Sequence, residues 1–254
     1  RIRPFLLRRL KEDVLTELPE KSENVLTVDM TPEQARVYRA ALSRLRPREE
    51  DISGTGRFRA LAALTELREV CDHPALILPE YQGSSGKLEL LSELLPGALL
   101  AGHRVLVFSQ FTRMLRIVEQ RLYASGIECF YLDGETPARD RVEMAQRFNR
   151  GEGSIFLISL KAGGAGLNLT GADFVIHYDP WWNPAAEDQA TDRAHRIGQG
   201  RPVTVTRLIT RNTVEERVFA LSQRKRDLFE RMIEAGETFP TSLSEAEIRG
   251  LFAE

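Results

Sequence analysis

The feature that most constrains this chain is a series of short apolar runs, each of strand length, which alternate with segments of helical periodicity. Between the first three runs, residues 112–124 and 137–149 repeat apolar side chains at helical spacing. Strands that are apolar on both faces and alternate with helices are typical of a parallel sheet covered by helices on both sides. The sequence therefore predicts an α/β fold. The apolar runs lie at residues 104–111, 127–132, 154–159, 174–178 and 203–209.

The ends of these predicted strands are where chemistry is expected. In a parallel sheet of this kind, ligands bind outside the carboxyl ends of the strands. The loops of interest therefore begin near Ser109, Asp133, Ser159, Asp179 and Thr210.

The pattern divides the chain into three zones. Residues 1–85 have the pattern of helices joined by loops, residues 86–211 contain the predicted sheet, and residues 212–254 are helical again. The signals behind this division are a helix start at Thr31 and Pro32, a helix over residues 58–71, a linker at Gly83-Ser84-Ser85-Gly86, and capping boxes that begin at Thr213 and Ser244.

The composition narrows the functional classes. There are 35 Lys and Arg against 37 Asp and Glu, a net charge of −2, so any nucleic-acid surface must be local. Two cysteines exclude a disulfide framework, and the four histidines lack metal-ligand spacing, so no metal site is predicted. No apolar run approaches the roughly 20 residues that cross a membrane. The chain begins with Arg1 and not with Met, which indicates a piece of a longer protein.

A phosphate-binding loop is superficially suggested by GSSGKL at residues 83–88. A true P-loop has four residues between its glycines and Ser or Thr after the lysine. Here only two residues separate Gly83 from Gly86, Leu88 follows Lys87, and the stretch precedes the first predicted strand. No other stretch qualifies, so a stand-alone nucleotide-hydrolysing enzyme is not expected.

A glycine-rich stretch, SLKAGGAGLNL at residues 159–169, follows a predicted strand. Its glycines allow the backbone to approach another molecule and to offer N–H groups to an anion, and Lys161 adds a positive charge. An ordinary turn is the alternative interpretation.

A second candidate is the helix predicted over residues 183–199, which Asn183 caps. Gln189, Arg193 and Arg196 fall on one polar stripe of this helix. Arginine offers a rigid, charged fork suited to phosphate. The alternative is a solvated face on which Asp192 pairs with Arg196.

Both tryptophans, Trp181 and Trp182, lie in the loop that precedes this helix. They either anchor the loop in the core, or Trp182 lies in a nucleic-acid groove. The residues alone leave both interpretations open.

The order of these stretches carries a resemblance. They are VLVFSQFT (105–112), LDGET (132–136), SLKAGGAGLNL (159–169), DPWWNP (179–184) and QATDRAHRIGQ (189–199). The set closely resembles the second RecA-like lobe of Swi/Snf-type ATPases, in helicase superfamily two. The stretches PFLLRR (4–9), VLTELP (14–19), CDHP (71–74) and SGKL (85–88) also resemble that family, so the likeness covers nearly the whole chain.

The resemblance implies a RecA-like sheet, with a helical protrusion inserted within residues 20–85 and a helical brace from Thr213 onward. It implies that ATP and Mg²⁺ bind between this lobe and a first RecA-like lobe of the same parent chain, which carries the phosphate loop. This chain alone would then hold no cofactor and show no activity.

The resemblance implies that the parent is an ATP-dependent translocase on the backbone of double-stranded DNA. It would lie in the cytoplasm or nucleoid of a prokaryote, which the short protrusion favours, or in a eukaryotic nucleus. The alternative is a non-catalytic module that docks duplex DNA or a partner.

The resemblance also assigns roles to residues. Arg193 and Arg196 would face the ATP phosphates as catalytic residues, and no residue would bind a metal. The nucleotide-binding residues would be Gly164, Gly166, Asn168 and Gln189. The DNA-binding residues would be Ser109, Gln110, Phe111, Thr136, Ser159, Lys161, Gly163 and Trp182.

Overall fold

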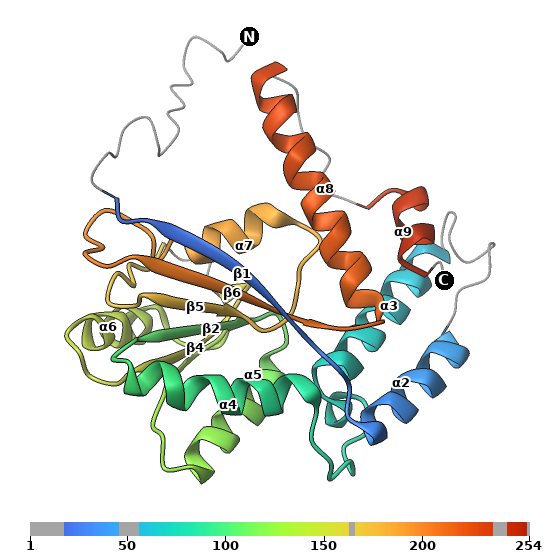
Figure 1. The fold of residues 1–254 in the computed structure, drawn as a ribbon, viewed down its shortest axis with the longest axis horizontal. Coiled ribbons are helices and arrows are strands. Elements are labelled where there is room, and N and C mark those ends of the chain that lie inside the picture. The colour runs from blue at the N-terminus through green and yellow to red at the C-terminus, as the bar shows by residue number, and fades with distance from the viewer. Residues whose placement is uncertain (1–17, 46–55, 163–165, 236–242, 253–254) are drawn as a thin grey trace.

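A computed structural model describes residues 18–45, 56–162, 166–235 and 243–252. Its centre is a six-stranded sheet in the order β1-β6-β5-β2-β4-β3, in which every neighbouring pair is parallel (Figure 1). The predicted α/β class with a parallel sheet is therefore confirmed. The strands are β1 (Lys21–Val28), β2 (Val105–Ser109), β3 (Phe130–Leu132), β4 (Ile155–Ser159), β5 (Phe174–His177) and β6 (Val203–Thr210).

Helices cover both faces of the sheet, because successive strand residues point to opposite sides. Val105 and Val107 of β2 pack in the cluster that contains α4 and α5, whereas Leu106 and Phe108 pack in the cluster that contains α6 and α7. The helices that flank the sheet are α4 (Gly86–Leu100), α5 (Thr112–Ala124), α6 (Ala138–Asn149) and α7 (Pro184–Thr191).

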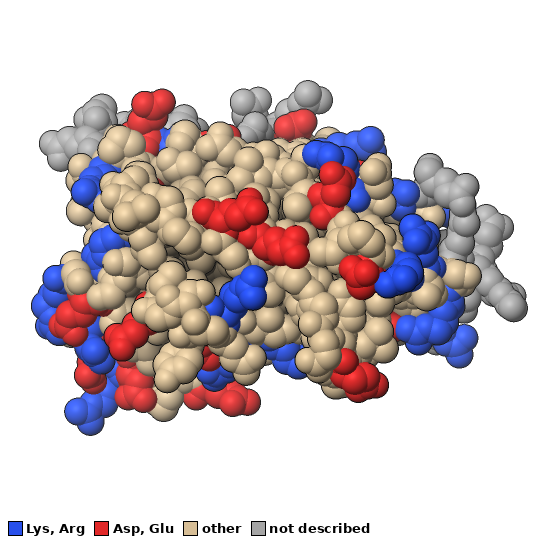
Figure 2. All heavy atoms as spheres, turned by 60° about the horizontal axis from the view of Figure 1, so that its bottom comes forward, with Lys and Arg blue, Asp and Glu red and all other residues tan. Residues whose placement is uncertain are grey.

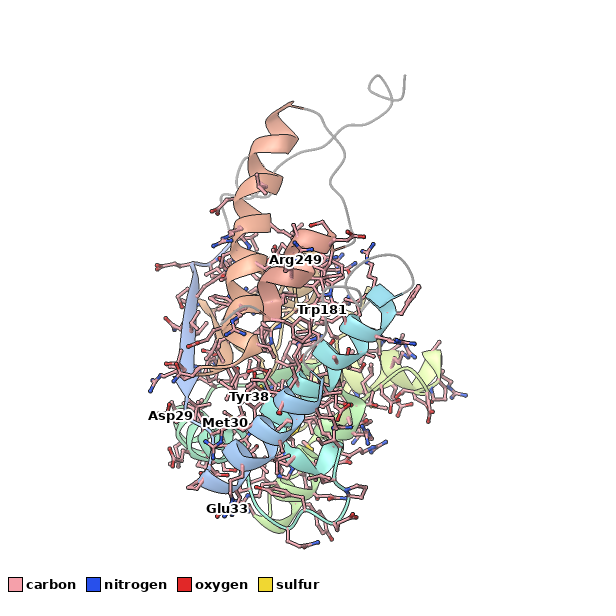
Figure 3. All side chains as sticks on the ribbon, turned by 90° about the vertical axis from the view of Figure 1, so that its right-hand side faces the viewer. Asp29, Met30, Glu33, Tyr38, Trp181 and Arg249 are labelled. Carbon is pink, nitrogen blue, oxygen red and sulfur yellow. The ribbon has the colours of Figure 1, made fainter. Side chains whose placement is uncertain are left out.

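A third group of helices forms its own apolar cluster beside the carboxyl ends of the strands (Figures 1 and 3). The backbone N–H of Val214 donates to the Tyr38 hydroxyl at 2.9 Å, which ties the first turn of α8 to α2. We call this group the helical layer; it consists of α2 (Pro32–Leu45), α3 (Arg57–Asp72), α8 (Val214–Ala235) and α9 (Glu245–Phe252), and a 3₁₀ turn at Pro74–Leu76 follows α3.

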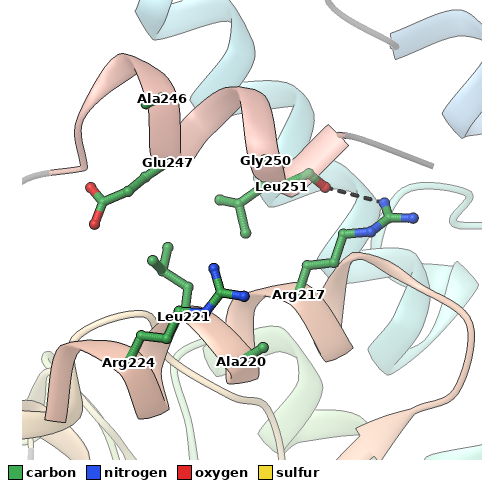
Figure 4. Close-up of a pocket in the computed structure, with 8 residues that line it drawn as sticks. All are labelled: Arg217, Ala220, Leu221, Arg224, Ala246, Glu247, Gly250 and Leu251. Carbon is green, nitrogen blue, oxygen red and sulfur yellow. Dashed lines mark hydrogen bonds between the residues drawn. The ribbon is translucent and has the colours of Figure 1, made fainter. Parts of the chain in front are cut away.

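A groove of about 340 Å³ lies between α8 and α9 (Figure 4). Arg217 crosses one end of it and donates to the carbonyl oxygen of Leu251 at 3.3 Å. The start of α9 is held by the predicted capping box, in which Ser244 and Glu247 each accept the other's backbone N–H, at 3.2 and 2.6 Å.

The expectation that residues 1–85 contain only helices and loops is wrong at β1. This strand pairs along its whole length with β6, from Lys21 opposite Val203 to Val28 opposite Thr210. It is an edge strand, and most of its residues are exposed. An edge strand can be polar on both faces, so the sequence of β1 lacks the apolar pattern by which the other strands were recognised.

The predicted linker at residues 83–86 is a loop as far as Ser85, and α4 begins at Gly86. Ser85 caps this helix by accepting the backbone N–H of Leu88 at 3.3 Å. Gly86 is buried so close to the end of β1 that an added Cβ would lie 2.1 Å from the carbonyl oxygen of Asp29. Glycine is required here by close backbone approach, and the segment joins two packed elements.

The helix predicted over residues 183–199 is shorter than expected. Asn183 caps it as predicted, accepting the N–H of Ala185 at 3.2 Å, but α7 ends at Thr191. Beyond it, the carbonyl oxygen of Arg193 accepts the backbone N–H of Leu169 at 2.9 Å. This carbonyl is thus bonded to the loop after β4. Gln189 and the two arginines therefore do not share one regular helix.

Candidate functional site

A hollow of about 290 Å³ brings the predicted arginines together with the glycine-rich loop. Gln189 reaches it from α7, and Arg193 and Arg196 reach it from the turns that follow. We call it the arginine hollow; its lining residues are Gly166, Leu167, Gln189, Asp192, Arg193 and Arg196. The predicted grouping thus occurs in space although the predicted helix does not continue.

The two arginines differ in their surroundings. Arg193 is only 4% exposed, its Nη1 donates to the carbonyl oxygen of Leu167 at 3.4 Å, and its Nε has no hydrogen-bond partner among the described residues. Burial and the nearby charge of Arg196 lower the pKa of Arg193 from its usual value. Arg196 itself is exposed. Two guanidinium groups at one hollow, one of them with an unused donor, favour an anion there.

The glycine-rich loop is described only in part, and Gly163 and Gly164 lie outside the described residues. Gly166 has φ +67° with no atom within 4 Å of a built Cβ, so its backbone conformation and not crowding favours glycine. Asn168 is exposed, but its Oδ1 accepts the N–H of Thr170 at 3.3 Å and its carbonyl oxygen accepts from Asn149 at 2.9 Å. Its side chain therefore holds the turn as well as facing solvent.

Apart from Gly163, which lies outside the described residues, the residues predicted to contact DNA lie at the carboxyl edge of the sheet. They come from the loops after β2, β3, β4 and β5, which are close in strand order. The N–H of Leu160 donates to the carbonyl oxygen of Ser109 at 2.8 Å, which joins two of these loops directly. Their side chains are not equally accessible, however.

Two predicted DNA contacts, Ser109 and Ser159, are 1% and 3% exposed. The Ser109 hydroxyl donates to Asp179 and accepts the N–H of Phe111 at 3.0 Å, so it organises its own loop. Thr136 is half-buried and accepts the N–H of Asp133 at 3.1 Å. Lys161 is exposed, and Gln110 and Phe111 are half-buried. These three side chains and the loop backbones are what this edge presents to a ligand.

The tryptophans serve as anchors for their loop. Their ring centres lie 5.4 Å apart. The backbone N–H of Trp181 donates to the Glu187 carboxylate at 2.8 Å. Trp182 packs on the helical layer, with the Lys225 ammonium 5.1 Å from its ring centre. This packing favours the core-anchoring interpretation, and both rings remain half-buried and line a hollow of about 340 Å³ with α3.

A group of buried charges was not predicted from the sequence. Lys87 is fully buried and donates to Asp72 at 2.9 Å and to Glu215 at 2.5 Å. Burial alone would lower the pKa of Lys87, but the carboxylates of Asp72 and Glu215 raise it above its usual value. This lysine is therefore committed to carboxylates, in agreement with the rejection of GSSGKL as a phosphate loop.

A second buried pair lies beside the first. Arg68 of α3 donates to Asp179, at the end of β5, at 3.5 Å. Burial raises the pKa of Asp179, and Arg68 and the Ser109 hydroxyl oppose that rise. We call the five charged residues Arg68, Asp72, Lys87, Asp179 and Glu215 the buried ion cluster. Four members lie in stretches singled out from the sequence, CDHP, SGKL, DPWWNP and the capping box at Thr213, but nothing in those stretches indicated that the members meet.

Over the described ranges, no three His, Cys, Asp or Glu side chains are grouped so as to hold a metal ion. In the same residues, no helix has the length and apolar character to span a membrane. Acidic and basic side chains are interspersed on the face in Figure 2, as expected for a net charge of −2. An anion-binding surface must therefore be local.

Comparison with known proteins decides the family. Residues 1–76 match the SNF2-related domain, and residues 86–198 match the helicase conserved C-terminal domain. The solved C-terminal domain of the Sulfolobus solfataricus SWI2/SNF2 ATPase is 31% identical to this chain, with a TM-score of 0.72, and the match covers 91% of this chain and 98% of that one. The chain belongs to the SWI2/SNF2 ATPase family.

Two longer proteins each contain a segment similar to this SWI2/SNF2 chain. This chain is 40% identical over 260 residues to the putative ATP-dependent helicase/translocase YwqA of Bacillus subtilis. The match covers 99% of this chain and 28% of YwqA. The chain is 36% identical, with a TM-score of 0.74, to the S. solfataricus SWI2/SNF2 ATPase core in complex with dsDNA. That match covers 98% of this chain and 54% of the core. The sheet and helices described here are thus the C-terminal helicase lobe of a SWI2/SNF2 ATPase.

Proposed function

We propose that this lobe is half of an ATP-dependent translocase on double-stranded DNA. In this proposal it supplies Arg193 and Arg196 to an ATP site shared with a first RecA-like lobe and contacts the DNA backbone through its strand-end loops. Residues 1–85 would hold the entry segment and the protrusion, residues 86–211 the RecA-like lobe, and residues 212–254 the brace. Within the first zone, β1 joins the sheet of the lobe. The arginine hollow is the observation that carries the proposal.

The chemistry follows from the two guanidinium groups. The buried Arg193 lies in a setting where water screens its charge little, so that charge would attract a phosphate in the hollow strongly. The exposed Arg196 can reach across to a nucleotide held by another lobe. There it would offset the negative charge that develops on the γ-phosphoryl group as the bond to the leaving group breaks.

The nucleotide site would be complete only when residues of both lobes surround the nucleotide. Gly166, with Gly164 and Gly163, would bring backbone N–H groups near the phosphates and the DNA, and Gln189 and Asn168 would contact the nucleotide. Mg²⁺ and the phosphate loop would belong to the first lobe. ATP binding would close the lobes, and hydrolysis would release them, which moves the strand-end loops along the DNA backbone.

DNA recognition in this proposal is by backbone and not by base. Lys161, Gln110, Phe111 and Trp182 lie at one edge, and backbone N–H groups there suit phosphate oxygens. The DNA-bound structure of the S. solfataricus relative supports duplex DNA as the partner. Contacts of this kind position the protein without selecting a sequence, and their affinity falls steeply with salt.

A non-catalytic docking module is the second candidate. It would need a charged edge but no pair of arginines gathered at one hollow beside the glycine-rich loop. The hollow therefore favours the catalytic proposal.

The test compares this chain with the two-lobed protein. Phosphate release with saturating duplex DNA should be strong in the two-lobed protein. It should be at the blank level for this chain alone, because nothing in its described residues cradles phosphates and magnesium together. Turnover that copurifies with the folded chain would contradict the proposal.

A further inference from the structure

One buried ion pair joins two loops at the carboxyl ends of neighbouring strands, residues 109–111 after β2 and residues 179–182 after β5. Asp179 accepts the Ser109 hydroxyl and the Gln110 N–H, the latter at 3.2 Å. Its other oxygen accepts from Arg68 at 3.5 Å. The side chains of Arg68 and Asp179 are 3% and 0% exposed. One carboxylate thus orders the first loop, and Arg68 holds that carboxylate.

Arg68 also holds the second loop directly. Its Nη2 donates to the carbonyl oxygen of Pro180, which precedes Trp181. Its guanidinium carbon lies 5.2 Å from the centre of the Trp181 ring and 5.6 Å from that of Phe111. Figure 3 shows Trp181 beside the helical layer that carries Arg68. A planar cation between one ring from each loop fixes where both rings lie.

Arg68 cannot itself be the contact to a large ligand. It is buried, its Nη2 donates to Asp179 and to the carbonyl oxygen of Pro180, and its Nε is enclosed without a partner in the described residues. The side chains it orders are half-buried and lie at the sheet edge: Gln110, Phe111, Trp181 and Trp182. The arginine comes from α3, outside the sheet, so this arrangement makes the geometry of the edge depend on how the helical layer docks.

We infer that Arg68 is a positioning residue for duplex DNA. From α3 it holds both strand-end loops in the arrangement in which they contact the DNA backbone. The inference rests on the proposed function, since it assumes that these loops meet DNA. It adds that the helical layer sets the affinity of the lobe for DNA.

The experiment uses the two-lobed protein with substitutions of matched charge and size. Arg68→Met removes the guanidinium group, and Arg68→Lys keeps the charge without its planar shape. Arg68→Met combined with Asp179→Asn avoids a buried unpaired carboxylate if the single variant folds poorly. Lys87→Met removes the neighbouring buried cation, whose hydrogen bonds go to Asp72 and Glu215 and which reaches Asp179 only through its charge. Arg44→Met removes the surface pair of α2 with Glu66.

The readouts separate positioning from stability. We expect Arg68→Met to raise the DNA concentration for half-maximal ATPase stimulation about tenfold, with turnover at saturating DNA changed less than about twofold. Arg68→Lys should be intermediate. The slope of log affinity against log salt should stay unchanged, because Arg68 neutralises no phosphate, whereas a direct contact would reduce it by about one. Arg44→Met should bind as the wild type does.

Three outcomes would overturn the inference. They are wild-type DNA affinity in the folded double variant, a reduced salt slope, and an equal loss of DNA affinity in Lys87→Met at a matched loss of melting temperature. If the wild-type protein binds no duplex DNA, the proposed function fails as well. Undiminished binding by the variants alone defeats only the role of Arg68.

Discussion

The arginine hollow and the buried ion cluster contain the same kinds of side chain in opposite settings. In the cluster, Lys87 is fully buried and donates to Asp72 and Glu215 at 2.9 and 2.5 Å. In the hollow, Arg193 is also buried but keeps an Nε–H with no partner in the described part of the chain, and Arg196 is exposed. Two carboxylates neutralise Lys87, so this cation holds elements together. The two arginines of the hollow lie beside one carboxylate, Asp192, which leaves positive charge for a ligand.

The pKa shifts follow the same division. Burial would lower the pKa of Lys87, but two carboxylates raise it, so its charge is kept by the fold. Burial and a second cation both lower the pKa of Arg193. An arriving phosphate would offset the repulsion between the two cations. The comparison therefore predicts that substitutions in the hollow affect turnover, whereas those in the cluster affect stability.

The largest expected effect is at Arg196. In the two-lobed protein, Arg196→Ala should lower DNA-stimulated ATP turnover by about 10³–10⁵-fold, as expected for a guanidinium that stabilises the transition state. Fold and DNA binding should remain nearly intact, because the side chain is exposed. Steady-state phosphate release measures the change. Arg211→Ala, which removes an exposed arginine paired with Asp29 at 2.9 Å, is the matched control.

Lysine at the same position sharpens this test. Arg196→Lys should rescue poorly, since a point charge lacks the planar fork. Near-normal turnover in Arg196→Ala would show that this turn is only a solvated face, and the catalytic assignment would then be wrong.

The next largest effect is at Lys87. Lys87→Met should lower the free energy of unfolding by about 3–5 kcal/mol, because it leaves Asp72 and Glu215 buried without their cation. Lys21→Met, which breaks a partly exposed pair with Glu23 at 2.7 Å, should cost less than about 1 kcal/mol. Urea unfolding followed by circular dichroism measures both. A Lys87 effect as small as that of Lys21 would mean that the cluster adds nothing beyond a surface pair.

The two regions were not equally predictable from sequence. The arginines lie three residues apart in one stretch, so the residues themselves pointed to a shared site. The cluster joins residues 68, 72, 87, 179 and 215, and no local spacing relates them. Likewise, the strands buried on both faces were recognised, whereas the exposed β1 was not. The end of α7 at Thr191 depends on a bond from Leu169, in another loop, to Arg193.

A third prediction concerns how α4 delivers Lys87 to the cluster. Gly86→Ala should destabilise the fold by about 1–3 kcal/mol, because its Cβ would lie 2.1 Å from the Asp29 carbonyl oxygen and push α4 from β1. Gly97→Ala, in the same helix with no atom within 4 Å of its Cβ, should instead stabilise by up to about 1 kcal/mol. Thermal unfolding of the pair measures the difference. Equal effects would show that α4 tolerates a shift, so that Lys87 does not depend on this close approach.

The smallest effect is expected at His177, which is buried beside the end of α7 without a carboxylate partner. It is 1% exposed, its Nε2 lies 2.9 Å from the Thr191 hydroxyl, and burial together with the charge of Arg207 lowers its pKa to about 3. Unlike Lys87, it stays neutral in the fold, whereas in the unfolded chain it takes up a proton near pH 6.5.

The contribution of His177 to stability is therefore complete above pH 6.5 and is lost as the pH falls toward 3. By pH 5.5 the loss should be about 1.4 kcal/mol. Urea unfolding between pH 7.5 and 5.5 should show this slope in the wild type and a flatter one in His177→Gln. An identical slope in both would mean that His177 takes up its proton over the same pH range in the folded lobe as in the unfolded chain. A buried cation here would then need no carboxylate to keep its charge.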